Sequence, residues 1–81
     1  MKIQVLFFSV LRDATQTVET TLEVAPATTV SGLLDHLYAR WPSLKSWDAN
    51  LLTAVDQTYV KRDTILHENA EVAMMPPVQG G

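Results

Sequence analysis

An apolar run near the start of the chain predicts a β-strand. Residues 2–8 read KIQVLFF and are rich in β-branched and aromatic side chains. Successive side chains of a strand point to opposite faces, which divides the run into two sets. We assign to the core the set that lacks a polar residue, namely Ile3, Val5 and Phe7. The opposite set consists of Gln4, Leu6 and Phe8, and we expect Phe8 to be partly exposed.

A second strand is predicted at residues 18–24, VETTLEV, where every second residue is a glutamate or threonine that suits a wet face. This alternation is typical of a half-buried strand in an antiparallel pair. Pro26 ends the strand, and residues 9–15 before it predict a short helical turn. The inward set of the strand is Val18, Thr20, Leu22 and Val24.

The apolar period lengthens to helical spacing in residues 28–42, which predicts an amphipathic helix. Thr28 or Thr29 caps its N-terminus, and Pro42 stops it. A glycine inside a helix costs up to about 1 kcal/mol relative to alanine, so we expect Gly32 to allow close packing against the sheet. The apolar stripe consists of Val30, Leu33, Leu34, Leu37, Tyr38 and Trp41.

A tight hairpin is predicted next. Two short runs of apolar and β-branched residues, 51–55 and 58–60, flank Asp56 and Gln57. Residues 43–50, which precede the hairpin, predict a loop or a short turn.

The last strand is predicted at residues 71–75, EVAMM. Its alternation places Val72 and Met74 in the core. It leaves Ala73 and Met75 on the outer face. The polar loop before this strand contains one apolar pair, Ile65–Leu66, which we expect to pack beneath the sheet.

The resulting order is strand, strand, helix, strand, strand, strand. One main helix covering one face of a mixed, mostly antiparallel sheet is an α+β arrangement. The order fits the β-grasp fold, and it also fits other small α+β packings. We place the folded domain at residues 1–75 and an extended C-terminal tail at residues 76–81.

The composition narrows the function classes. An apolar content of 47% with 19% charged residues is typical of a globular domain, and 81 residues suffice for one modest core. The net charge of -3 and the scattered basic residues argue against nucleic-acid binding. The chain has no cysteine, and neither His36 nor His67 has a second ligand at metal spacing, so we expect no metal site.

The N-terminal apolar run also bears on localisation. It is too short to span a bilayer and lacks a small-residue cleavage site. We therefore expect a cytoplasmic protein that does not bind membranes.

The tail, PPVQGG, is unusual in a chain with three glycines. Pro76 and Pro77 have a fixed φ and no N–H, so they favour an extended arm that leaves the sheet. Gly80 and Gly81 give the arm a slim tip whose functional group is the α-carboxylate. Such a tip suits entry into a narrow partner tunnel and activation by adenylation, although a terminal Gly-Gly is also an ordinary flexible end.

Three segments, VLFFSVLRD, LLTAVDQTYV and the terminal PPVQGG, resemble the MoaD-type small subunit of molybdopterin synthase over the full length. The resemblance implies a ubiquitin-like β-grasp fold and a sulfur carrier. An E1-like adenylating enzyme would use ATP and magnesium to activate Gly81, and a persulfide-bearing sulfurtransferase would convert it to a thiocarboxylate. The large synthase subunit would then pass the sulfur to cyclic pyranopterin monophosphate, in a heterotetramer with two large subunits.

The resemblance also implies the site. Gly81 carries the sulfur, Gly80 is its slim neighbour, and Phe8 and Met75 face the partner. We expect an apolar patch of Leu6, Phe8, Met75 and Val78, continued along the arm by Pro76, Pro77 and Gln79. A reversed strand register would put Phe7 and Met74 in the patch instead.

The sequence departs from the family at three places. Met74–Met75 replace the usual aromatic pair, and Asp56 replaces the usual asparagine of the hairpin. Asn69 stands in a changed turn before the last strand, where it can supply a positive φ.

Other functions remain open at this level. The chain has no paired acid and base or activated nucleophile, which indicates a non-catalytic, sulfur-donating subunit with no bound cofactor of its own. The alternatives are a sulfur carrier for thiamin, tRNA thiolation or cysteine synthesis, a β-grasp interaction module with an inert tail, and a covalent protein tag.

Overall fold

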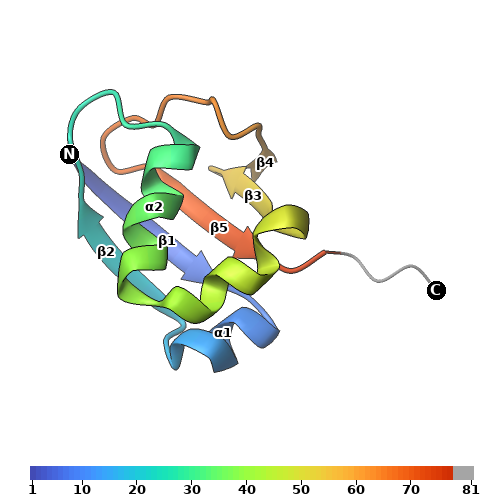
Figure 1. Ribbon diagram of the computed structural model, residues 1–81. Coiled ribbons are helices and arrows are strands. Elements are labelled where there is room, and N and C mark those ends of the chain that lie inside the picture. The colour runs from blue at the N-terminus through green and yellow to red at the C-terminus, as the bar shows by residue number, and fades with distance from the viewer. Residues whose placement is uncertain (78–81) are drawn as a thin grey trace.

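Five strands form one mixed sheet within residues 1–77, which the computed structural model describes (Figure 1). Their order across the sheet is β2-β1-β5-β3-β4. β1 and β5 are parallel neighbours, whereas the other neighbouring strands pair antiparallel. The predicted mixed, mostly antiparallel sheet is therefore confirmed. The strands are β1 (Lys2–Phe7), β2 (Glu19–Glu23), β3 (Leu52–Val55), β4 (Thr58–Tyr59) and β5 (Glu71–Met75).

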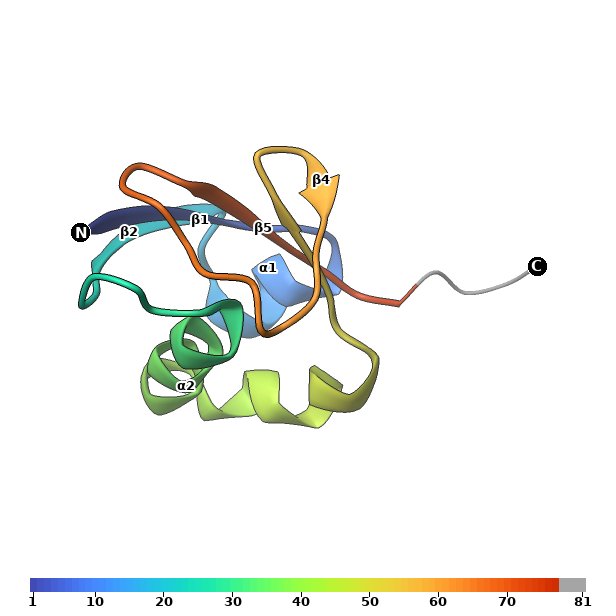
Figure 2. The ribbon, with the colours of Figure 1, turned by 90° about the horizontal axis from the view of Figure 1, so that it is seen from above.

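The predicted helix, α2 (Val30–Arg40), lies across one face of the sheet, as Figure 2 shows. Thr29 caps it, because its Oγ1 accepts a hydrogen bond from the Gly32 N–H at 3.1 Å. The expected packing of Gly32 against the sheet is wrong. A Cβ at this position would meet the Thr28 side chain at 3.0 Å, so Gly32 makes room for the residue before the cap.

Two short helices lie on the same side of the sheet as α2 (Figure 2). α1 (Val10–Thr15) confirms the predicted helical turn. Residues 43–50 are not a loop, because they belong to the 3₁₀ helix η1 (Pro42–Asn50). Pro42 stops α2 but suits the first turn of the next helix, where its missing N–H would have no partner. Leu44 is fully buried and anchors η1 in the core.

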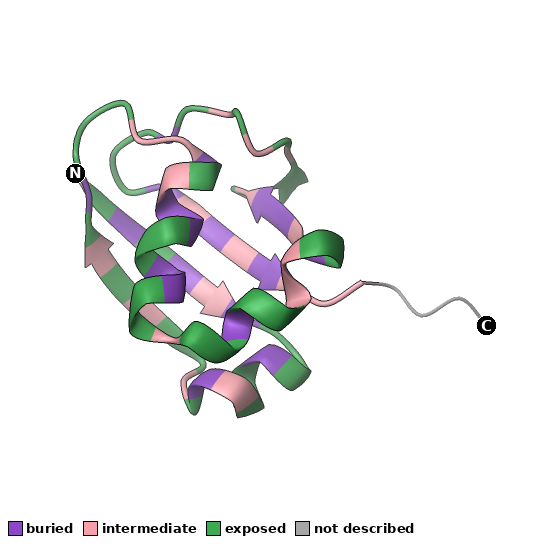
Figure 3. Ribbon diagram, in the orientation of Figure 1, coloured by how far each residue is buried: buried purple, intermediate pink, exposed green. Residues whose placement is uncertain are grey.

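The core lies between the sheet and these helices, and it contains the inward sets predicted for the first and last strands. Along β1 and β5, buried and more exposed residues alternate (Figure 3). The stripe of α2 is buried except for Trp41, which is partly buried and meets the Phe7 ring edge-on at 5.3 Å between centroids. The buried strand residues are Ile3, Val5, Phe7, Val72 and Met74.

Two apolar residues predicted to be inward are exposed. Val18 is 62% exposed because it precedes β2, in a bend where strand alternation does not set its direction. Ile65 is 64% exposed, whereas its neighbour Leu66 is buried. The two neighbours point apart because the segment is extended at this point, where Ile65 forms a β-bridge with Thr29.

A polar cluster ties η1 to α2 and to the segment before β5. The Asp48 carboxylate accepts hydrogen bonds from the Tyr38 hydroxyl and, at 2.7 Å, from Arg62 Nη1. Burial, together with the bond to Asp48, raises the pKa of Tyr38 well above its usual range. Arg62 is therefore part of the fold and is not a free surface charge.

Candidate partner-docking site

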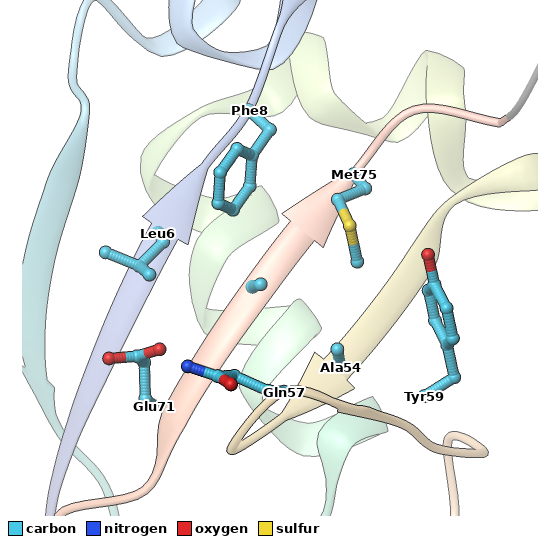
Figure 4. Close-up of a pocket in the computed structure, with 8 residues that line it drawn as sticks. Leu6, Phe8, Ala54, Gln57, Tyr59, Glu71 and Met75 are labelled. Carbon is cyan, nitrogen blue, oxygen red and sulfur yellow. The ribbon is translucent and has the colours of Figure 1, made fainter.

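The outer face of the sheet carries an apolar hollow of about 280 Å³ (Figure 4). Among residues 1–77, no helix lies over this face (Figure 2). We call the hollow and its lining residues the docking face. Its lining residues are Leu6, Phe8, Ala54, Gln57, Tyr59, Glu71, Ala73 and Met75.

The shape of the docking face follows from the strand register. Ala73 in β5 pairs with Leu6 on one side and with Ala54 on the other. The two alanines have short side chains, so they form a floor, and the larger side chains of neighbouring strands stand around it. Figure 4 shows Phe8 and Met75 at one end of the hollow and Tyr59 beside it.

The side chains at the rim are accessible although they are apolar. Phe8 is 43% exposed and Tyr59 is 66% exposed, while Leu6 and Met75 are half-buried. The expectation that Leu6, Phe8 and Met75 share the outer face is confirmed, and the reversed register is excluded. Exposed apolar side chains gathered in a hollow mark a site of contact with another molecule.

The docking face adjoins the residues that follow β5. Met75 ends β5, and Pro76 and Pro77 follow it with half-buried side chains. These two prolines line a second hollow of about 330 Å³ together with Ser9, Val10 and Trp47. The other predicted site residues, Val78, Gln79, Gly80 and Gly81, lie outside the described residues.

Polar residues surround the opposite end of the hollow, where the β3–β4 turn meets the start of β5. One oxygen of Asp56, Oδ1, accepts a hydrogen bond from the Glu71 N–H at 3.1 Å. The other, Oδ2, lies 2.6 Å from His67 Nε2. The bond to Asp56 raises the pKa of His67, and the Glu71 N–H, followed by the His67 ring, lowers the pKa of Asp56.

Sequence analysis missed part of the docking face. Tyr59, Gln57 and Ala54 belong to the β3–β4 hairpin, and the sequence predicts that hairpin without saying which strand it joins. The missing information is the pairing of β3 with β5, which brings the hairpin beside Ala73. The available signal in the sequence was Tyr59, an aromatic residue two positions after the turn residue Gln57.

Two features are absent from the described part of the chain. Within residues 1–77, no three histidine, aspartate or glutamate side chains gather closely enough to hold a metal ion. None of the helices in this part of the chain is long and apolar enough to cross a membrane.

Comparison with known proteins identifies the family. Residues 5–81 match the model of the ThiS family. The chain belongs to the ThiS family. A curated relative is the molybdopterin synthase sulfur carrier subunit of Escherichia coli K12, with 43% identity over 82 residues, covering 98% of this chain and 99% of the relative. The resemblance to molybdopterin synthase small subunits is thus confirmed.

Solved structures confirm the α+β, ubiquitin-like β-grasp fold. A putative molybdopterin converting factor subunit 1 from Pyrococcus furiosus superposes with a TM-score of 0.87 and 26% identity, covering 95% of this chain and 98% of that one. A chain from the complex of subunits 1 and 2 of the Helicobacter pylori 26695 molybdopterin-converting factor gives a TM-score of 0.70 at 20% identity, with both chains fully covered. At this identity the second likeness concerns the fold alone.

Proposed function

We propose that this protein is the sulfur carrier subunit of molybdopterin synthase. A thiocarboxylate on Gly81 donates sulfur to cyclic pyranopterin monophosphate during molybdenum cofactor biosynthesis. The observation that carries the proposal is the apolar docking face, which ends at Met75 where the tail begins. The 43% identity to a curated sulfur carrier, over nearly all of both chains, supports the same function.

The docking face and the tail have separate tasks in this scheme. The docking face binds the large synthase subunit, and the arm from Pro76 to Gly81 reaches into that subunit's active site. The Helicobacter pylori protein, which shares the fold, occurs in a complex of subunits 1 and 2, and by analogy this chain has a large-subunit partner. Two carriers and two large subunits then make a heterotetramer.

The chemistry takes place on the Gly81 carboxylate. On an E1-like adenylating enzyme, a carboxylate oxygen attacks the α-phosphorus of magnesium-bound ATP and releases pyrophosphate. The outer sulfur of a persulfide then attacks the acyl carbon and displaces AMP. A thiol reduces the acyl disulfide so formed and frees the thiocarboxylate. The carrier itself supplies no acid, base or cofactor to these steps, and it acts as a non-catalytic subunit.

The first test is intact mass spectrometry of the full chain after incubation with the adenylating enzyme, ATP, magnesium and a persulfide donor. We expect a mass increase equal to the exchange of one oxygen for sulfur. Deletion of Gly81, or addition of one residue after it, should abolish the increase while leaving the fold intact. Absence of the increase with a demonstrably active enzyme would contradict the carrier chemistry.

The second test identifies the acceptor. The sulfurated carrier is mixed with the large subunit and cyclic pyranopterin monophosphate, and the formation of molybdopterin is followed. Gly81→Ala tests the narrow tunnel in the same assay, because a methyl group at the tip should slow transfer strongly. Sulfuration without molybdopterin formation would favour a carrier for thiamin, tRNA thiolation or cysteine synthesis.

A further inference from the structure

The β3–β4 turn has a conformation that suits Asp56 but does not suit Gln57. Its two central residues, Asp56 and Gln57, have φ values of 49° and 72°. A two-residue hairpin with positive φ at both positions favours Asn-Gly, because glycine has no Cβ to clash with the backbone. Gln57 has no such freedom, so interactions elsewhere must hold the turn in place.

Asp56 supplies those interactions. Its N–H donates to the Glu71 carbonyl oxygen at 2.8 Å, and its Oδ1 accepts from the Glu71 N–H at 3.1 Å. Its remaining oxygen, Oδ2, faces His67 Nε2 at 2.6 Å. The turn is thereby fastened both to β5 and to the segment that precedes it.

The charged form of His67 fits this position. Its second ring nitrogen, Nδ1, lies 2.9 Å from the Glu68 carbonyl oxygen. Both ring nitrogens therefore face acceptors, and an imidazolium satisfies both because each of its nitrogens carries a hydrogen. A neutral ring has one N–H and leaves one of these acceptors without a donor.

The turn positions part of the docking face. Gln57 lines the hollow directly, and Tyr59 follows two residues later in β4. Figure 4 shows the Gln57 side chain reaching across β5 towards Glu71, at the polar end of the hollow. Movement of the turn would therefore displace two of the side chains that line the docking face.

We propose that His67 and Asp56 form a latch that fixes the β3–β4 turn, and with it Gln57 and Tyr59, in the arrangement that the docking face presents to its partner. The proposal rests on the proposed docking function. His67 is a positioning residue, since it lines no part of the hollow. Its protonation closes the latch, and partner affinity falls as pH rises and the ring loses its charge.

Among the charged groups around His67, Asp56 is the one that controls the latch. On its own segment the Glu68 carboxylate accepts a hydrogen bond from the Lys2 N–H. Glu71, at the start of β5, engages Asp56 through its backbone, and its side chain lines the hollow. Asp56 in the turn is the carboxylate that contacts the ring, and its hydrogen bond raises the pKa of His67.

The first experiment uses the free carrier, so it does not depend on a partner. Hydrogen exchange of the Glu71 amide, corrected for the intrinsic pH dependence of exchange, reports how firmly Asp56 holds it. We expect its protection to fall about two- to fivefold as pH rises through the pKa of His67, because exposed ion pairs have effects of this size. His67→Gln should give a pH-independent profile. His36→Gln, which removes a histidine on the exposed side of α2, should keep the wild-type profile.

The second experiment measures binding of the purified large synthase subunit by calorimetry over the same pH range. The wild-type dissociation constant should rise about two- to fivefold with pH relative to His67→Gln, which corrects for titration of the partner. Asp56→Asn keeps a turn-forming residue without the charge, so its profile should match that of His67→Gln.

The outcomes separate the two proposals. Equal Glu71 protection profiles in wild type and His67→Gln would overturn the latch, whatever the partner does. A pH-dependent protection with unchanged binding would overturn its link to the docking face. Failure of every variant to bind the large subunit at any pH would instead overturn the proposed docking function, while exchange would still decide whether the latch exists.

Discussion

The sheet contains two pairs of identical neighbours, Phe7–Phe8 and Met74–Met75. In each pair, the first residue lies on the inner face and the second on the outer face. Phe7 is 1% exposed and Met74 is fully buried, and the two are register partners across β1 and β5. Phe8 is 43% exposed and Met75 is half-buried, and both line the docking face. Residues of the same type thus serve the core and the surface one position apart.

The difference lies in what covers each face. The inner residues pack beneath the helices, and Phe7 contacts Trp41 edge-on. In the described part of the chain, no helix packs against the outer pair (Figure 2). Burial explains an apolar residue on the inner face. It does not explain one on the outer face, where a polar residue would be equally compatible with the fold. The outer pair therefore points to a contact made outside this chain.

The largest expected effect separates Phe7 from Phe8. Phe7→Ala should lower the free energy of unfolding by about 3–5 kcal/mol, because it removes a fully buried ring and leaves a cavity. Phe8→Ala should lower it by less than about 1 kcal/mol, since much of that ring is already in contact with water. Urea unfolding followed by circular dichroism measures both values. Equal losses for the two variants would refute the assignment of the faces.

The next effect is on binding. Met75→Lys should weaken binding to the large subunit by about 2 kcal/mol or more, because it places a charge in an apolar contact. Met75→Leu keeps the apolar character and serves as the matched control. Both variants should unfold at nearly the wild-type urea concentration. Unchanged affinity of Met75→Lys, measured by calorimetry, would show that the partner uses another face.

The sequence predicts which residues of the first and last strands lie on each face, but it does not predict the full lining of the docking face. Alternation along residues 2–8 and 71–75 separates Phe7 from Phe8 and Met74 from Met75. In each run a polar residue on one of the two faces shows which face is the outer one. The floor made by Ala54 and Ala73 is a product of pairing between strands about twenty residues apart. No local pattern contains that pairing, so Tyr59 and Gln57 were not predicted to belong to the site.

The 3₁₀ helix η1 illustrates a second limit. The polar residues after Pro42 favour a loop on local grounds, whereas the buried Leu44 and the hydrogen bonds that Asp48 accepts hold the segment as a helix. The prediction for Val18 is wrong for a different reason, because the alternating pattern begins one residue before the strand does. Tertiary contacts decide the first case, and the bend that precedes β2 decides the second.

A smaller effect concerns the helix that covers the inner face. Thr29→Ala removes the side chain that caps α2 and should lower the free energy of unfolding by about 1 kcal/mol. Thr21→Ala, at an exposed position of β2, should change it by less than about 0.5 kcal/mol. Thermal unfolding compares the two. Partner affinity should be the same in both variants, since neither residue lines the docking face.

The smallest effect is the pH dependence of stability from the exposed pair His67 and Asp56. The pKa of His67 is raised above its ordinary value of 6.5, so its stabilising contribution is complete below that value and is lost as pH rises through the folded-state pKa. The pKa of Asp56 is lowered from 3.8, so its contribution is present above that value and is lost as pH falls through the folded-state pKa. The difference in stability between wild type and His67→Gln should therefore be largest between about pH 4 and pH 6.5 and should vanish at higher pH. Urea midpoints of the two proteins, measured across this pH range, test the prediction. If their difference in stability grew above neutral pH, the neutral ring, and not the imidazolium, would be the form that binds Asp56.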